Sequence, residues 1–208
     1  MPKLVNRNKY RQELLEKCFY IFSRKGYSNV TMREIAAEIG VSTGTIYHYF
    51  ANKQDILKQM FKYIVETNVE KYLKRVKNAQ TETLEERLHL LVDFVIDFED
   101  YYKHVLLLVL DLFRIYGSEE SERIISEFSK YYTDTIAEQL NLPDQFAKSL
   151  FIYIVGLVFH SLVTPHHTPF SENMYILKNL LQSVIAKTGQ TNGDIKHMLL
   201  DSLVEANH

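Results

Sequence analysis

Residues 31–50 carry the pattern that most constrains the fold of this chain. Thr31 and Glu34 have the spacing of a capping box, in which each side chain bonds the other's backbone, and this predicts a helix beginning at residue 32. Gly40 predicts the end of that helix, because glycine adopts a left-handed backbone conformation at no steric cost. Ser42 is suited to cap a second short helix. The two short helices predict a helix-turn-helix.

The apolar residues that such a pair needs are present. Ala36 supplies a small side chain where the helices approach, and the apolar positions are Ile35, Ile39, Val41 and Ile46. An apolar face at i, i+3, i+4 and i+7 predicts a preceding helix from about residue 8 to residue 25, with Gly26 as its stop: Leu15, Cys18, Phe19 and Phe22. Cys18 is expected to be a packed thiol. As a single cysteine, it excludes a disulfide framework and a cysteine-based zinc site.

The outward residues of the second short helix are expected to be Thr43, Gly44, Thr45, Tyr47 and His48. Hydroxyl and imidazole groups bond base edges and phosphate oxygens, and Gly44 lets the backbone come close to a partner. Two interpretations stay open for the last two residues: Tyr47 contacts phosphate or holds the domain together, and His48 contacts DNA or is an inert surface residue.

A third segment begins after the pair. Asn52 is expected to cap it and to place Lys53 in its first turn, where free N–H groups and a lysine favour a phosphate.

The charge distribution agrees with an anionic partner for the N-terminal part. Residues 1–62 hold 11 Lys and Arg against 5 Asp and Glu, whereas residues 63–208 hold 13 against 21. A basic head on an acidic body favours contact with a polyanion.

The sequence TMREIA at 31–36, followed by GVSTGTIYHYF at 40–50 and NK at 52–53, resembles the DNA-binding signature of TetR-family transcriptional regulators. The preceding FSRKGY at 22–27 resembles the end of that family's first helix. The resemblance covers about residues 8–61. It implies an all-α homodimer that binds a palindromic operator and releases it when a small molecule binds the body.

The resemblance also implies which residues meet DNA. The residues that would form or flank the surface that reads DNA, including the helix-capping residues Ser42 and Asn52, are Ser42, Thr43, Gly44, Thr45, Tyr47, His48, Tyr49 and Asn52. Those that would clamp phosphates are Thr31, Arg33 and Lys53.

The rest of the chain is expected to be helical. Only 7 Gly and 4 Pro occur in 208 residues, which favours long helices over a turn-rich β fold. We expect an all-α fold of about nine or ten helices, with a DNA-binding domain at 1–52 and a ligand-binding and dimerisation domain at 53–208. The helices expected in the body span 53–78, 84–100, 102–116, 118–140, 145–163, 172–187 and 193–207. The helix at 53–78 would transmit the signal between the two domains. Gly117 and Ser118 are expected to separate the helix at 102–116 from the one at 118–140. Within 102–116, residues 105–110 are expected to be buried.

The effector pocket is expected among inward aromatic residues of the middle helices, which suits a hydrophobic or aromatic ligand. The candidates are Phe61, Phe94, Phe98, Tyr101, Leu106, Phe113, Phe128, Tyr132 and Phe151. For each one, a core position is the competing interpretation. Asp111 and Arg114 are either anchors for a charged ligand group or a structural ion pair.

Residues 145–163 are too apolar for a monomer surface and are expected to form a four-helix dimer interface with 172–187, with Gly156 allowing close approach. The uncharged stretch 149–164 is shorter than the ~20 residues of a membrane span, so a buried helix is expected. With no recognisable targeting segment, the protein is expected in the cytoplasm.

Other function classes are less well supported. The sequence holds none of the motifs of common hydrolases, zinc proteases, P-loop enzymes or dinucleotide-binding enzymes, so no enzyme activity is expected. His160, His166 and His167 match no zinc pattern, and neither a metal nor a cofactor is expected. An activator, or an adaptor with a vestigial head, remains an alternative to a repressor.

Overall fold

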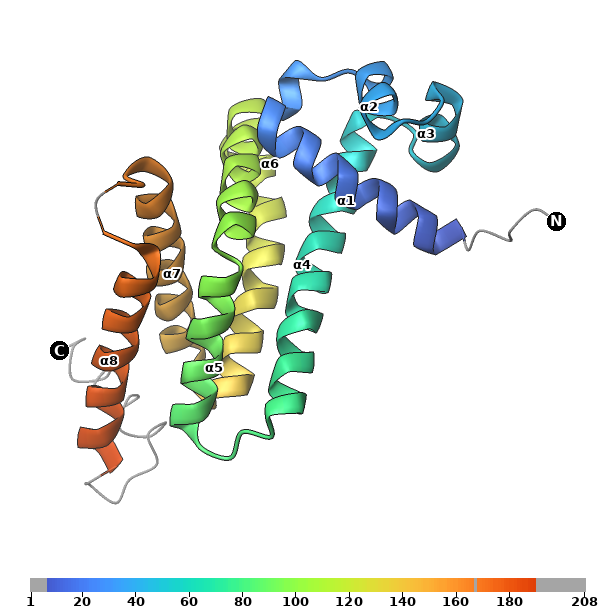
Figure 1. Cartoon of the computed structure of the whole chain (residues 1–208). Coiled ribbons are helices and arrows are strands. Elements are labelled where there is room, and N and C mark those ends of the chain that lie inside the picture. Colours follow the sequence, from blue (N-terminus) through green and yellow to red (C-terminus); the bar gives the residue numbers. More distant parts are fainter. Residues whose placement is uncertain (1–6, 167, 190–208) are drawn as a thin grey trace. The chain divides into compact units, whose positions relative to one another are not determined.

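The structure is a computed structural model that describes residues 7–166 and 168–189. Eight α-helices and one 3-10 helix make up the described part, so the fold is all-α as expected. Their bounds are α1 Arg7–Lys25, η1 Tyr27–Asn29, α2 Met32–Ile39, α3 Thr43–Tyr49, α4 Lys53–Ala79, α5 Leu84–Asp97, α6 Glu99–Leu140, α7 Asp144–Val163 and α8 Phe170–Gly189 (Figure 1). The short helix expected at 193–207 lies outside the described residues.

The described chain divides into two compact units. The first comprises residues 7–68 and 104–128, and the second comprises residues 69–103 and 129–189. Helices α4 and α6 each contribute to both units, so the expected boundary after residue 52 does not coincide with the division between them. The separation into a DNA-binding domain at 1–52 and a body at 53–208 is a functional one and stays a prediction.

The core of the first unit forms around α1, as its apolar face predicts. Cys18 and Phe22 are fully buried there, and Ile35 of α2, Ile46 of α3 and Phe50, which follows α3, are buried as well. Helix α1 packs on α2, and α2 packs on α3. Burial raises the pKa of the Cys18 thiol to about 12, which agrees with a packed rather than a reactive cysteine.

Helix α6 has a sharp break at the predicted position. Gly117 has φ 72° and ψ −168°, outside the helical region, so residues 99–116 and 118–140 are two helical segments joined there. A side chain is strained at such a positive φ, which explains a glycine at this point. One expectation for the first segment is wrong: within 105–110 only Leu108 is buried, whereas Leu107 and Leu110 are 37% and 43% exposed. Their side chains point away from the face of the helix that carries Leu108.

The second unit leaves an apolar face uncovered. Helix α8 packs against both α5 and α7 (Figure 1). The expectation of a buried helix at 149–164 is wrong for the chain by itself, because Ile152 and Phe159 of α7 are 68% and 47% exposed. By length and composition, α7 is the one described helix that is apolar enough to cross a membrane. A soluble protein's interface helix has the same composition, so this property alone does not decide its surroundings.

Candidate nucleic-acid interface

The start of α2 is fixed by the predicted capping box. The Thr31 hydroxyl accepts a hydrogen bond from the Glu34 N–H at 3.3 Å, and the Glu34 carboxylate accepts one from the Thr31 N–H at 2.8 Å. Hydrogen bonds from the Thr31 backbone and then from its side chain hold the pKa of Glu34 below its usual value. Because its hydroxyl also donates to Glu34, Thr31 serves the cap in this structure. A phosphate contact of Thr31 or Arg33 stays a prediction.

The turn between the two helices follows the predicted geometry. Gly40 has φ 82° and donates its N–H to the carbonyl oxygen of Ala36 at 3.1 Å. The N–H of Val41 donates to the same oxygen at 2.9 Å. Ser42 then caps α3 by accepting from the Thr45 N–H at 3.0 Å, and the Ser42 and Thr45 hydroxyls are 2.8 Å apart. Both ends of the turn are therefore held by bonds within this segment.

Helix α3 buries one side and presents the other. Ile46 is fully buried, whereas Gly44, Tyr47 and His48 are exposed. The 54% exposure of Tyr47 argues against a role in holding the domain together. Tyr49 is half-buried and has its ring against those of His48 and Tyr10. The outward face thus offers a phenol and an imidazole around a glycine.

Neither the backbone conformation nor the packing at position 44 requires a glycine. Its φ is not positive, and a β-carbon built on it would lie 3.7 Å from the Ser42 hydroxyl oxygen, which is an ordinary van der Waals distance. Alanine is the better helix former. The space that Gly44 leaves open faces outward, which suits the close approach of a partner.

The start of α4 is held by the side chains of Asn52 and Asp55. Asn52 accepts from the Asp55 N–H at 2.8 Å, and Asp55 accepts from the Ala51 N–H at 3.0 Å. The prediction that Asn52 caps this helix is therefore confirmed.

Lys53 has an unexpected set of partners. Its ammonium donates to the carbonyl oxygens of Tyr27 and Val30, each at 2.8 Å, and lies 4.4 Å from the centre of the Tyr27 ring. Partial burial lowers the pKa of Lys53, an effect that the charge of Glu34 opposes. Two of the three ammonium hydrogens therefore stabilise the loop before α2. A phosphate contact of Lys53 stays a prediction, and the third hydrogen is the one that would make it.

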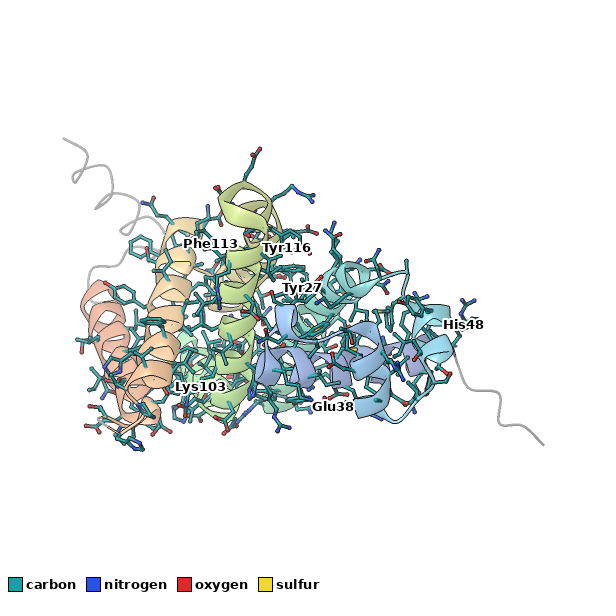
Figure 2. All side chains as sticks on the ribbon, turned by 90° about the horizontal axis from the view of Figure 1, so that it is seen from above. Tyr27, Glu38, His48, Lys103, Phe113 and Tyr116 are labelled. Atoms are coloured by element: carbon teal, nitrogen blue, oxygen red, sulfur yellow. The ribbon has the colours of Figure 1, made fainter. Side chains whose placement is uncertain are left out.

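Tyr27 connects this loop to α6. Its N–H donates to a carboxylate oxygen of Asp111 at 2.8 Å, and its hydroxyl is 3.5 Å from that of Tyr116 (Figure 2). Burial, followed by the Tyr116 hydroxyl, raises the pKa of Tyr27. Sequence reasoning singled out Asp111 as a carboxylate in an apolar run, but it missed the hydrogen bond to the Tyr27 backbone and the place of Tyr116 beside Tyr27. The distance from Asp111 to Arg114 is 3.9 Å, and the Arg114 side chain is 81% exposed.

The expected pocket residues form separate aromatic groups within the two units. In the first unit, Phe61 and Phe128 are stacked with ring centres 5.5 Å apart, Leu106 is half-buried, and Phe113 is 55% exposed instead of inward. Phe113 stands apart because the N-terminal segment of α6 buries only one face. In the second unit, the contacts run Phe94–Phe98 at 4.5 Å, Phe98–Tyr101 at 6.2 Å and Tyr132–Phe151 at 5.8 Å. The assignment of these side chains to an effector site stays a prediction.

The second unit also buries polar groups among these rings. The hydroxyl of Tyr72, a residue not among the predicted pocket candidates, has no hydrogen-bond partner among the described residues, and burial raises its pKa to about 12. Burial first, and then the neighbouring Tyr101, raises the pKa of Tyr132. Phenols that are buried in this way can orient a ligand.

The histidines expected not to bind metal are scattered in the described part. His160 lies within 3.2 Å of the Thr164 hydroxyl, His166 is exposed, and His167 lies outside the described residues. Over residues 7–166 and 168–189, no group of three His, Cys, Asp or Glu side chains is arranged to hold a metal ion.

Comparison with known proteins decides the family. The profile of the bacterial regulatory proteins of the tetR family matches residues 14–60, the segment that holds the helix-turn-helix. Residues 14–60 therefore carry the N-terminal domain of the tetR family of bacterial regulatory proteins. This is a family of regulatory proteins, in agreement with the expectation that the chain is not an enzyme.

Individual curated relatives match only part of the chain. The HTH-type transcriptional regulator HbdR of Aromatoleum sp. (strain CIB) is 41% identical over 66 residues, which are 32% of this chain and 28% of that protein. The matches to HbdR and the next two curated relatives each cover less than half of the relative's length.

Solved structures of transcriptional regulators share the fold over most of the chain. The regulator FadR from Bacillus subtilis in complex with stearoyl-CoA is 22% identical, with a TM-score of 0.68 over 83% of this chain and 97% of that one. The regulator AibR in complex with isovaleryl coenzyme A and operator DNA is 20% identical, with a TM-score of 0.58 over 82% and 96%. At these identities, the likeness establishes the fold.

Proposed function

We propose that this protein is a ligand-responsive transcriptional repressor that binds a palindromic operator as a homodimer in the cytoplasm. The observation that carries the proposal is the outward face of α3, where Gly44, Tyr47 and His48 are exposed while Ile46 on the other side is fully buried. Nothing in the packing of the described head requires a glycine at position 44. A recognition helix in the major groove needs this combination of polar groups and close approach.

The repressor would dimerise through α7 and α8. Large apolar side chains are exposed on both helices: Ile152, Tyr153, Phe159 and Val163 on α7, and Tyr175, Ile176 and Leu180 on α8. Gly156 lies among them, and a β-carbon built on it meets no atom within 4 Å. A contiguous apolar face of this kind favours a second copy of the chain, and a two-fold dimer would present two recognition helices to a symmetric site.

The dimer is tested with charged substitutions on that face. We expect Ile152→Arg with Leu180→Arg to give a monomer by light scattering after size exclusion and to lose operator binding. Leu73→Arg is the matched control, because Leu73 of α4 is 38% exposed and lies outside this face. A wild-type protein that is monomeric at micromolar concentration would refute this part of the proposal.

The effector would be a hydrophobic or aromatic molecule, and an acyl-CoA is the first candidate. The support is the run of ring contacts from Tyr72 through Phe94 and Phe98 to Tyr101, with the buried Tyr72 hydroxyl at its start, together with the acyl-CoAs bound by FadR and AibR. Release of DNA requires that the effector bind one of two conformations more tightly than the other. A coupling of about 1–3 kcal/mol is usual for such regulators.

The direct test uses a labelled fragment of the DNA upstream of the protein's own gene. We expect fluorescence anisotropy to show binding that survives unrelated competitor DNA, and stearoyl-CoA or a shorter acyl-CoA to release the fragment where free coenzyme A does not. Equal, weak binding to both DNAs would contradict operator recognition at this fragment. Binding that no acyl-CoA weakens would contradict the assignment of the effector class.

A further inference from the structure

An open hollow lies on the part of the head that carries α3. It has a volume of about 560 Å³ and is lined by one residue of α1 and four of α3: Tyr10, Gly44, Thr45, His48 and Tyr49. Figure 2 shows His48 at the opposite end of the first unit from Tyr27 and Tyr116. The hollow is therefore far from the contacts with α6 and open on the side where the recognition residues are exposed.

Tyr10 is fixed relative to the recognition helix. Its ring centre is 5.5 Å from that of Tyr49 at an interplanar angle of 58°, and the ring of His48 meets Tyr49 edge-on at 5.1 Å. Tyr49 is thus held between a side chain of α1 and one of its own helix. This packing gives Tyr10 a set position beside α3, although it comes from a different element.

The lining chemistry suits an anion. The hollow offers two phenols, one hydroxyl and one imidazole, and its lining contains no carboxylate. The Thr45 hydroxyl shares a hydrogen bond with Ser42 in which either oxygen can be the donor, and the phenols and the imidazole are the other donors of the hollow. Basic residues Arg7 and Lys9 precede Tyr10, and the first turn of α1 contains no acidic residue.

We infer that Tyr10 is a further DNA-contacting residue and that the hollow receives a phosphate of the operator backbone. The Tyr10 hydroxyl donates a hydrogen bond to that phosphate while its ring stays packed on Tyr49. The inference rests on the proposed function, because it requires α3 to lie in the major groove. A phosphate contact positions the protein on DNA but carries no sequence information.

The test is Tyr10→Phe, which removes the hydroxyl and keeps the ring. The DNA is a palindrome selected by the wild-type protein from random sequences, together with an unrelated duplex of the same length. A hydrogen bond to a charged group is strong enough that we expect roughly tenfold weaker binding to both DNAs, so that the ratio of the two affinities is unchanged. The melting temperature and the salt dependence stay as in the wild type, since the phenol is neutral.

Tyr20→Phe is the matched control, because Tyr20 lies on the same helix, is 47% exposed and is not part of the hollow. We expect it to bind both DNAs as the wild type does. Unchanged affinity of Tyr10→Phe would overturn the inference and leave the proposed function standing. A loss confined to the palindrome would overturn the assignment to phosphate, because it would show base reading. A wild-type protein that selects no sequence would overturn the proposed function and the inference with it.

Discussion

Replacing Gly44 with alanine is expected to stabilise the protein and to weaken its binding to DNA. Stability rises while DNA binding falls because the added methyl group acts on the protein interior in one case and on the DNA-facing side of α3 in the other. Inside the protein, the added methyl group meets only the Ser42 hydroxyl oxygen, at 3.7 Å, and the backbone needs no left-handed conformation. On the outside, the same methyl group occupies space at the surface that is proposed to enter the major groove.

The magnitudes follow from the position of the residue. Alanine is favoured over glycine by about 1 kcal/mol in a helix interior, and by about half of that at the second residue of α3. For a chain of this size, such a gain raises the melting temperature by about 1–2 °C. A methyl group that separates the helix backbone from DNA is expected to weaken operator binding at least about tenfold, which corresponds to ~1.4 kcal/mol.

Thermal unfolding followed by circular dichroism, with anisotropy titrations of the selected operator, measures both effects in the same variant. Ser126→Ala serves as the control, because Ser126 is an exposed helical residue of the first unit and alanine stabilises helices there as well. We expect this control to raise the melting temperature and to leave DNA binding unchanged. A Gly44→Ala protein that melts earlier, or one that binds the operator with wild-type affinity, would refute the argument that this glycine serves DNA approach.

Three further predictions concern the first unit. Asp111→Ala leaves the Tyr27 N–H without its acceptor, so the free energy of unfolding in urea should fall by about 1–3 kcal/mol, whereas Asp111→Asn, which keeps an acceptor oxygen, should lose less. The pKa of Glu34 is lowered by folding, so its contribution to stability is present above the usual value of 4.5 and is lost as the pH falls through the lower folded value. Glu34→Gln should therefore unfold with a smaller pH dependence below pH 4.5; an unchanged slope would contradict the capping assignment. Cys18, with its pKa raised to about 12, should react with a thiol reagent at pH 8 only after denaturant is added, and rapid labelling of the native protein would contradict the buried position.

The head could be predicted almost residue by residue because its signals are local. A capping box, a glycine with positive φ and an N-cap serine each act within four residues of the chain, so the sequence pattern and the structure coincide at Thr31, Gly40 and Ser42. The break at Gly117 was predictable for the same reason.

Longer-range contacts were not predictable in this way. The Asp111 carboxylate meets a backbone N–H that lies 84 positions away, and no periodicity in either segment indicates that pairing. Lys53 was expected to face a phosphate, yet two of its hydrogens bond carbonyl oxygens at positions 27 and 30. Exposure in the body was misjudged for Phe113 and Ile152, because hydrophobic patterning marks the apolar residues and does not show which of them the chain's own helices cover.

Selection of DNA from a random library by the purified full-length protein tests the proposed role of α3 most directly. We predict enrichment of a palindrome whose half-sites are separated by about one helical turn, roughly 10 base pairs, or a multiple of it. The Gly44→Ala protein, folded and at least as stable, should fail to enrich the same palindrome. Failure of the wild-type protein to enrich any sequence, or equal enrichment by both proteins, would contradict recognition of DNA by this face of α3.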